Sequence, residues 1–151
     1  MRSVLTTALI LTASTAAADP LERLIVATEA LSEKANAFYI SRVPALEGKL
    51  PDMTIDDELR TALSCALDSI VTEGGPDMQA AYVESMEEMA TRDITTMSDL
   101  QEMPDVVPDD ILFAAMSECG MMEITAQRMQ DSGFWEAMQD PGVLEALMAE
   151  D

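Results

Sequence analysis

The sequence predicts an all-α protein, a small helical bundle of about five helices that a disulfide between Cys65 and Cys119 clips together. Through most of the chain, apolar residues recur at spacings of three and four, which places them along one face of a helix. No segment alternates apolar and polar residues between hairpin turns, the pattern that is typical of strands. Two cysteines in a chain that carries an export signal are expected to pair.

The first 18 residues have the pattern of a secretory signal peptide. Arg2 supplies a positive start, residues 4–13 form a short apolar run, and residues 16–18 are the small side chains of a cleavage site. The run is too short to remain as a membrane anchor. We therefore expect a soluble periplasmic or secreted protein, cleaved near Ala18, with a single helical domain over residues 19–151.

A first helix is predicted from the mature N-terminus to about Ile40. Asp19 can cap it, Pro20 suits its first position, and Glu22 completes a capping-box pattern. Its inward stripe consists of Leu21, Leu24, Thr28, Leu31, Ala35 and Phe38. Prolines and a glycine then interrupt the period, so residues 41–54 are predicted to be a connection with one helical turn at 45–48.

A second helix is predicted over residues 55–71, with Thr54 as its cap and Gly74-Gly75 as its stop. Its apolar stripe consists of Leu59, Ala62, Leu63, Ala66, Leu67, Ile70 and Val71. Pro76 starts a third helix that ends near Thr91. The inward residues of this third helix are Tyr82, Val83, Met86, Met89 and Ala90.

The longest strongly apolar segment, residues 109–130, is predicted to be one central helix, preceded by a short turn that Ser98 can cap. Its stripe consists of Leu112, Ala115, Met116, Cys119, Met122, Ala126 and Met129, widened by Phe113, Gly120, Met121 and Ile124. A helix that is apolar nearly all round is expected to be buried nearly all round. Gly120 lowers the helix preference by about 1 kcal/mol relative to alanine, so it marks a close approach or a bend.

Ser132-Gly133 ends the central helix, and a short apolar turn with Phe134, Trp135 and Met138 follows. Asp140-Pro141 then starts a final helix that is expected to dock on the bundle. The apolar residues of this helix are Val143, Leu144, Leu147 and Met148.

The two cysteines differ in where they lie on their helices. Cys119 is on the inward stripe of the central helix, whereas Cys65 lies off the stripe of its own helix, near Thr61 and Ser69. A disulfide therefore requires that the second helix contact its partner along its flank. Closing a loop of about 55 residues is expected to stabilise the fold by about 4 kcal/mol in the chain-entropy model.

Acidic residues dominate the charge. The chain has 29 acidic and 8 basic residues, a net charge of −21, which becomes −22 when Arg2 leaves with the signal peptide. Such a surface repels nucleic acid and anionic membranes. It can attract basic proteins or cations, although a solvated face that keeps the protein dispersed is the simpler interpretation.

Catalytic motifs are missing from the sequence. The chain has no histidine, which excludes Ser-His-Asp, Cys-His and H-E-x-x-H chemistry, and it has no nucleophile elbow, Walker loop or dinucleotide fingerprint. A pair of carboxylates can catalyse glycoside hydrolysis, and Glu118 and Glu123, on or beside the central helix, are the acids of most interest for that role. The favoured interpretation is that they lie on a solvated strip of the helix. The segment from Asp52 lacks the glycine and the final acid of a calcium-binding EF-hand loop.

Methionine is the remaining unusual feature, with 13 in the chain. Core packing is the ordinary role for methionine at helical spacing, but a methionine-lined groove can also adapt to apolar partner segments. We therefore expect a non-enzymatic exported protein, without a cofactor, that binds another exported protein or peptide. The predicted groove residues are Met86, Met89, Met121 and Met122. The alternative is a periplasmic copper carrier that uses the same thioethers, which suit Cu(I).

Overall fold

The computed structural model describes residues 19–102 and 104–149, and within these ranges the chain is helical, with seven α-helices, one 3-10 helix and no strand. The all-α class and the disulfide are confirmed. The described residues form more helices than the five or so that the sequence predicts. The predicted signal peptide, residues 1–18, lies outside the described residues. None of the described helices combines the length and the apolar character that crossing a membrane requires.

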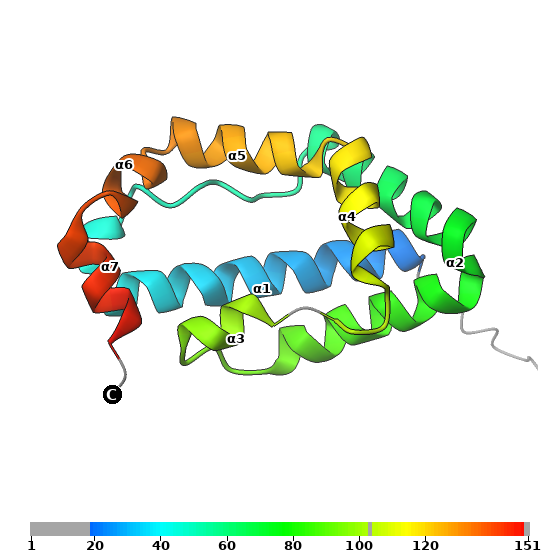
Figure 1. Ribbon diagram of the computed structural model, residues 1–151, viewed down its shortest axis with the longest axis horizontal. Helices are drawn as coiled ribbons and strands as arrows, with labels where there is room; N and C mark the ends of the chain where they lie inside the picture. Colours follow the sequence, from blue (N-terminus) through cyan, green and yellow to red (C-terminus); the bar gives the residue numbers. More distant parts are fainter. Residues whose placement is uncertain (1–18, 103, 150–151) are drawn as a thin grey trace, which may run out of the picture.

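Helix α1 runs along the long axis of the molecule and packs mainly against α2 (Figure 1). The elements are α1 (Pro20–Arg42), the 3-10 helix η1 (Pro44–Leu46), α2 (Asp57–Thr91), α3 (Met97–Gln101), α4 (Asp109–Glu118), α5 (Met121–Asp131), α6 (Phe134–Met138) and α7 (Pro141–Met148). The bent helix α2 forms one end of the molecule, and α6 and α7 form the other. Helix α5 lies on the far side of segment 47–56 from α1.

Helix α1 begins as predicted and is tied to α2 by ion pairs. The Asp19 side chain accepts a hydrogen bond of 2.9 Å from the Leu21 amide and caps the helix. The predicted capping box is wrong, because the Glu22 carboxylate pairs with the Arg60 guanidinium of α2. Further along α1, Arg23 donates to Glu87 at 2.8 Å. These two contacts connect α1 to both ends of α2.

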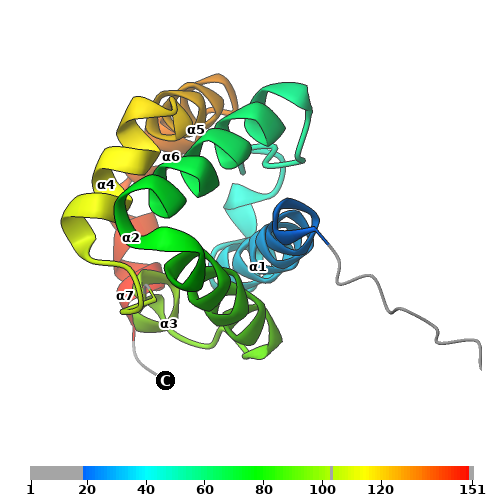
Figure 2. The ribbon, with the colours of Figure 1, turned by 90° about the vertical axis from the view of Figure 1, so that its right-hand side faces the viewer.

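Helix α2 bends sharply where the sequence predicts a break. Gly75 has φ 81° and ψ 174°, a conformation that is essentially restricted to glycine, and Pro76 follows it. The two arms of α2 consequently point in different directions (Figure 2). The predicted cap at Thr54 is wrong, because the Asp56 side chain accepts from the Leu59 amide at 3.0 Å and the helix begins at Asp57.

The main core lies between α1, both arms of α2, and α4. Ile70 and Val83, on opposite sides of the break in α2, are both fully buried. The buried members of this cluster are Leu24, Ile25, Leu59, Ala62, Leu63, Ala66, Leu67, Ile70, Tyr82, Val83, Val107, Leu112, Ala115 and Met121. The core thus contains most of the stripe predicted for residues 55–71.

A second, smaller cluster fastens the C-terminal helices to the end of α1. Phe38 of α1 and Leu46 of η1 pack with Val143 and Leu147 of α7. The Asp140 side chain accepts from the Gly142 amide at 2.8 Å, which caps α7 as predicted. The predicted docking of the final helix is therefore confirmed.

The predicted central helix is divided into two, so the single-helix prediction is wrong. Helix α4 ends at Glu118, Gly120 adopts φ 77°, and α5 begins at Met121. A left-handed residue cannot continue a right-handed α-helix, and glycine adopts that conformation at little cost. The bend that Gly120 was expected to allow is therefore a corner between two short helices.

The disulfide joins this corner to α2. Cys119 caps the end of α4, and its Cα lies 5.6 Å from that of Cys65. Cys65 is exposed on the first arm of α2, beside the buried Ala66. The predicted flank contact between the two helices is therefore confirmed.

Helix α3 begins one residue before the predicted cap. The Thr96 hydroxyl accepts from the Asp99 amide at 3.2 Å, and the Asp99 carboxylate accepts from the Thr96 amide at 2.7 Å. This capping box places Ser98 inside the helix, so the prediction that Ser98 caps it is wrong.

Candidate functional site

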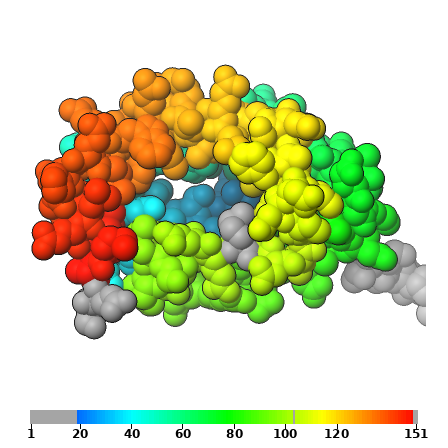
Figure 3. Space-filling model, in the orientation of Figure 1, coloured from blue at the N-terminus to red at the C-terminus, as the bar shows by residue number. Residues whose placement is uncertain are grey.

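An apolar pocket of about 530 Å³ lies on the inner side of the corner between α4 and α5. Its lining residues are Asp109, Leu112, Phe113, Met116, Met121, Met122, Thr125, Ala126, Met129 and Trp135. Figure 3 shows the face of the molecule on which α4 and α5 meet, above and beside a hollow that α1 bounds from behind. Pockets of this size are typical of ligand and anchor-residue sites.

Each helix contributes one face to the pocket. On α4, Asp109, Leu112, Phe113 and Met116 follow the spacing of three and four that aligns side chains on one side of a helix. On α5, the residues from Met122 to Met129 repeat that spacing. Because Gly120 turns the chain between the helices, the two faces meet at an angle and enclose a concave surface.

The pocket exposes more large apolar surface than packing requires. Phe113 is 63% exposed, Trp135 50% and Met122 48%, whereas Leu112 and Met121 at the base are buried. The expectation that segment 109–130 is buried nearly all round is therefore wrong. Two short helices at an angle press only one side against α2 and leave the opposite side open. Exposed aromatic and methionine side chains gathered at one place are characteristic of binding surfaces.

The four predicted groove methionines do not lie together. Met121 and Met122 line the pocket, but Met86 packs against the main core from the second arm of α2. Met89 lines a separate small depression beside Leu31 and Ile94.

Four residues that line the pocket are absent from the predicted groove: Met116, Met129, Phe113 and Trp135. The first three belong to the apolar stripe that the sequence displays. Trp135 follows the left-handed Gly133, so no helical period connects it to them.

The two acidic residues that the sequence singles out lie at the surface. Glu118 and Glu123 are both exposed, which agrees with their assignment to a solvated strip. Within the part of the chain that the structure describes, no three His, Cys, Asp or Glu residues are placed to hold a metal ion.

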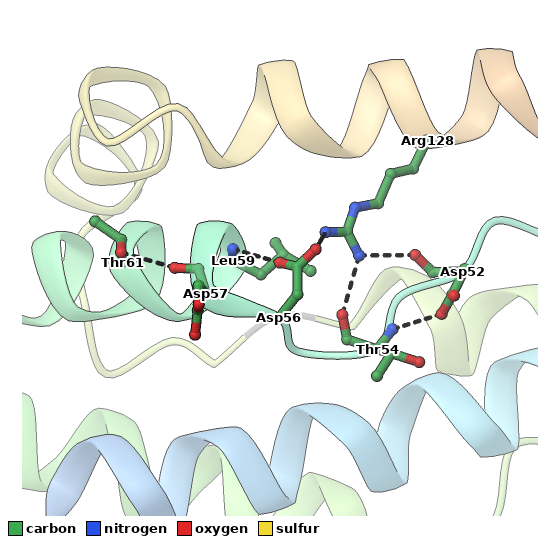
Figure 4. A network of polar contacts seen from close by, with 7 residues as sticks. All are labelled: Asp52, Thr54, Asp56, Asp57, Leu59, Thr61 and Arg128. Atoms are coloured by element: carbon green, nitrogen blue, oxygen red, sulfur yellow. Dashed lines mark hydrogen bonds and ion pairs between the residues drawn. The ribbon is translucent and has the colours of Figure 1, made fainter.

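Arg128 lies on the side of α5 that faces away from the pocket, and it joins α5 to the segment before α2 (Figure 4). Its guanidinium donates to the carbonyls of Asp52 and Thr54 at 2.9 and 3.0 Å, and to the Asp56 carboxylate at 2.6 Å. The hydrogen bond from the Leu59 amide, and after it the charge of Arg128, hold the pKa of Asp56 below its ordinary value. Hydrogen bonds from Thr54 lower the pKa of Asp52 in the same way.

Arg128→Met is expected to lower the free energy of unfolding by about 1 to 2 kcal/mol, because two backbone carbonyls lose a charged donor. Since the pKa of folded Asp56 is lowered, its stabilising contribution is present above the unfolded pKa, near 4, and is lost as the pH falls through the folded value. Urea denaturation at several pH values between 7 and 2 measures both effects. The difference between wild type and Arg128→Met should shrink on acidification, and a constant difference would contradict the role of Asp56.

Fold and site together define a disulfide-linked all-α protein with an open apolar pocket. Comparisons with protein-family models, with curated proteins and with solved structures give no match to this chain. The chemistry of its own residues is therefore the guide to its function.

Proposed function

We propose that this protein is an exported, non-enzymatic binding protein whose pocket between α4, α5 and α6 receives an apolar segment of another protein or peptide. The observation that carries the proposal is the exposure of Phe113, Met122 and Trp135 around one apolar pocket. Covering these side chains would remove them from water, which is the main driving force of association.

The composition of the pocket supports a peptide segment as the ligand. Aromatic residues and methionine are enriched at protein interfaces, and the flexible thioether side chains of methionine adapt to varied apolar shapes. Met116, Met121, Met122 and Met129 supply four such side chains. The chain has no histidine to act as a general base, and Glu118 and Glu123 are exposed, which supports binding over catalysis.

Trp135 provides a direct test, because it is the single tryptophan of the chain and lines the pocket. The probe is a helical peptide of about 18 residues with leucine at positions i, i+3, i+4 and i+7 and glutamine on its polar face. Binding should shift the Trp135 emission to shorter wavelength and protect it from acrylamide. Emission and quenching that stay unchanged at saturating peptide would contradict the proposal.

Met122→Glu is expected to weaken binding of this peptide at least about tenfold, because docking would bury a charge without a partner. The matched control is Met148→Glu, which places the same charge on α7 at a methionine that is 68% exposed and does not line the pocket. It should bind like wild type, with circular dichroism confirming that both variants fold. Equal weakening by both variants would place the binding surface elsewhere.

A second candidate, copper binding, is supported by the four thioethers that line the same pocket. We propose it as the alternative because thioethers are soft ligands that suit Cu(I). Replacing Met116, Met121, Met122 and Met129 by leucine keeps the pocket apolar and removes the sulfur atoms. Titration of Cu(I) against a competing chelator then separates the two candidates. Copper binding that disappears while peptide binding persists would support a carrier, and copper affinity unchanged by the replacement would exclude one.

A further inference from the structure

We propose that the segment received by the pocket is a basic amphipathic helix, with an apolar face for the pocket and lysine or arginine beside it. This inference rests on the proposed function and adds the charge and the conformation of the partner. Its support is the distribution of charge around the pocket and the dimensions of the two helices that form it.

The part of the chain that builds the pocket is strongly acidic. Between Asp109 and Trp135, the first and the last residue of the pocket lining, there are five acidic residues and one basic residue, Arg128. The Arg128 guanidinium is held on the opposite side of α5 by Asp52, Thr54 and Asp56. No basic residue lines the pocket, and its one charged lining residue is Asp109, so the lining carries a net negative charge.

Asp109 is the charged member of the pocket wall. It lies in the first turn of α4, and it forms no hydrogen bond or ion pair with the described residues. A lysine or arginine of a docked segment would therefore meet an unpaired carboxylate at the rim. Charge pairs at an interface rim favour the correct partner and speed its approach.

The same charge disfavours other apolar occupants. A second copy of this chain would bring another net charge of −21, or −22 without the signal peptide, against the first. A fatty acid would place its carboxylate near Asp109, and an anionic membrane would be repelled over the whole surface. A cationic amphipathic segment would instead be attracted by this negative charge.

The dimensions of the pocket match one face of a helix. The lining runs from Asp109 to Met116 on α4 and from Met122 to Met129 on α5, each about 10 Å of helix at 1.5 Å per residue. Apolar residues at i, i+3, i+4 and i+7 of a partner helix also extend over about 10 Å. Such a helix can place its apolar stripe in the corner while its basic residues lie at the rim.

Three peptides of about 18 residues that differ only in the polar face test the inference. All have leucine at i, i+3, i+4 and i+7, and their polar faces carry lysine, glutamine or glutamate. We expect Trp135 fluorescence to give an affinity about tenfold higher for the lysine peptide than for the glutamine peptide, and a lower one for the glutamate peptide. The difference should narrow as salt is raised from 0.05 to 0.5 M, because salt screens exposed charges.

The outcomes separate the two proposals. Equal affinity for the lysine and glutamine peptides would overturn the basic partner and leave the proposed function standing. Absence of binding by all three would overturn the proposed function itself. Met122→Glu tests for unspecific attraction to the acidic surface. If the lysine peptide bound only through such attraction, the added carboxylate would leave its affinity unchanged or raise it. If the peptide docks in the pocket, this variant should bind the lysine peptide more weakly than wild type does.

Asp109→Asn is expected to weaken binding of the lysine peptide about threefold to fivefold, the upper part of the range for an exposed charge pair, and to leave binding of the glutamine peptide unchanged. The matched control is Asp110→Asn, which also lies in the first turn of α4 but does not line the pocket. This control should weaken binding of the lysine peptide less than about twofold. Equal effects of the two replacements would contradict the role of Asp109.

Discussion

Replacing both cysteines, as Cys65→Ala with Cys119→Ala, is expected to lower the free energy of unfolding by about 4 kcal/mol. In the chain-entropy model this is the effect of releasing a closed loop of about 55 residues. For a domain of this length the melting temperature should fall by about 15 °C. Urea denaturation and thermal melting followed by circular dichroism measure the change.

Reduction supplies the control for this variant. Dithiothreitol should destabilise wild type by a similar amount and leave the double alanine variant unchanged. A loss below about 1 kcal/mol would show that packing between α2 and α4 holds the corner without the disulfide. Because Cys119 adjoins the Gly120 corner, we also expect the reduced protein to bind the test peptide more weakly.

Ile70→Ala is expected to lower the free energy of unfolding by about 3 to 4 kcal/mol, the second large effect. Ile70 is 0% exposed and lies in the main core near the end of the first arm of α2. Its truncation removes apolar contacts and leaves a cavity that the surrounding helices fill only in part. Urea denaturation measures this change, and Ile70→Val should cost about 1 kcal/mol.

Val26→Ala is the matched surface control. Val26 is 66% exposed on α1, so its truncation should change the free energy of unfolding by less than about 0.5 kcal/mol. A similar loss at both positions would contradict the assignment of Ile70 to the core.

Much of the fold could be predicted, because it depends on interactions between neighbours in the sequence. Asp19, Pro20 and Asp140-Pro141 mark helix starts through local hydrogen bonds and a restricted φ, and both helices begin there. Gly75 interrupts α2 where the sequence predicts a break. The errors at Thr54 and Ser98 are also local, since several polar residues compete for each cap and small energy differences decide between them.

The pocket could be predicted only in part. Its two helix faces are visible in the spacing from Leu112 to Met129, but their exposure depends on a corner whose direction the spacing does not contain. Met86 and Met89 resemble Met121 and Met122 in the sequence, yet they lie on the second arm of α2 and do not line the pocket. Composition does not distinguish methionines that fill a core from methionines that line a pocket.

The sequence by itself determined the all-α class, the cysteine pair, the break at Gly75 and the acidic character of the chain. Each of these follows from residue type and local spacing, which act over a few residues or through total charge. Only the tertiary structure decided that Gly120 makes a corner and that Trp135 joins the pocket. The path of a helix after a left-handed glycine is set by distant contacts, here the disulfide to Cys65 and the Arg128 hydrogen bonds. Such contacts join residues far apart along the chain, so spacing does not reveal them.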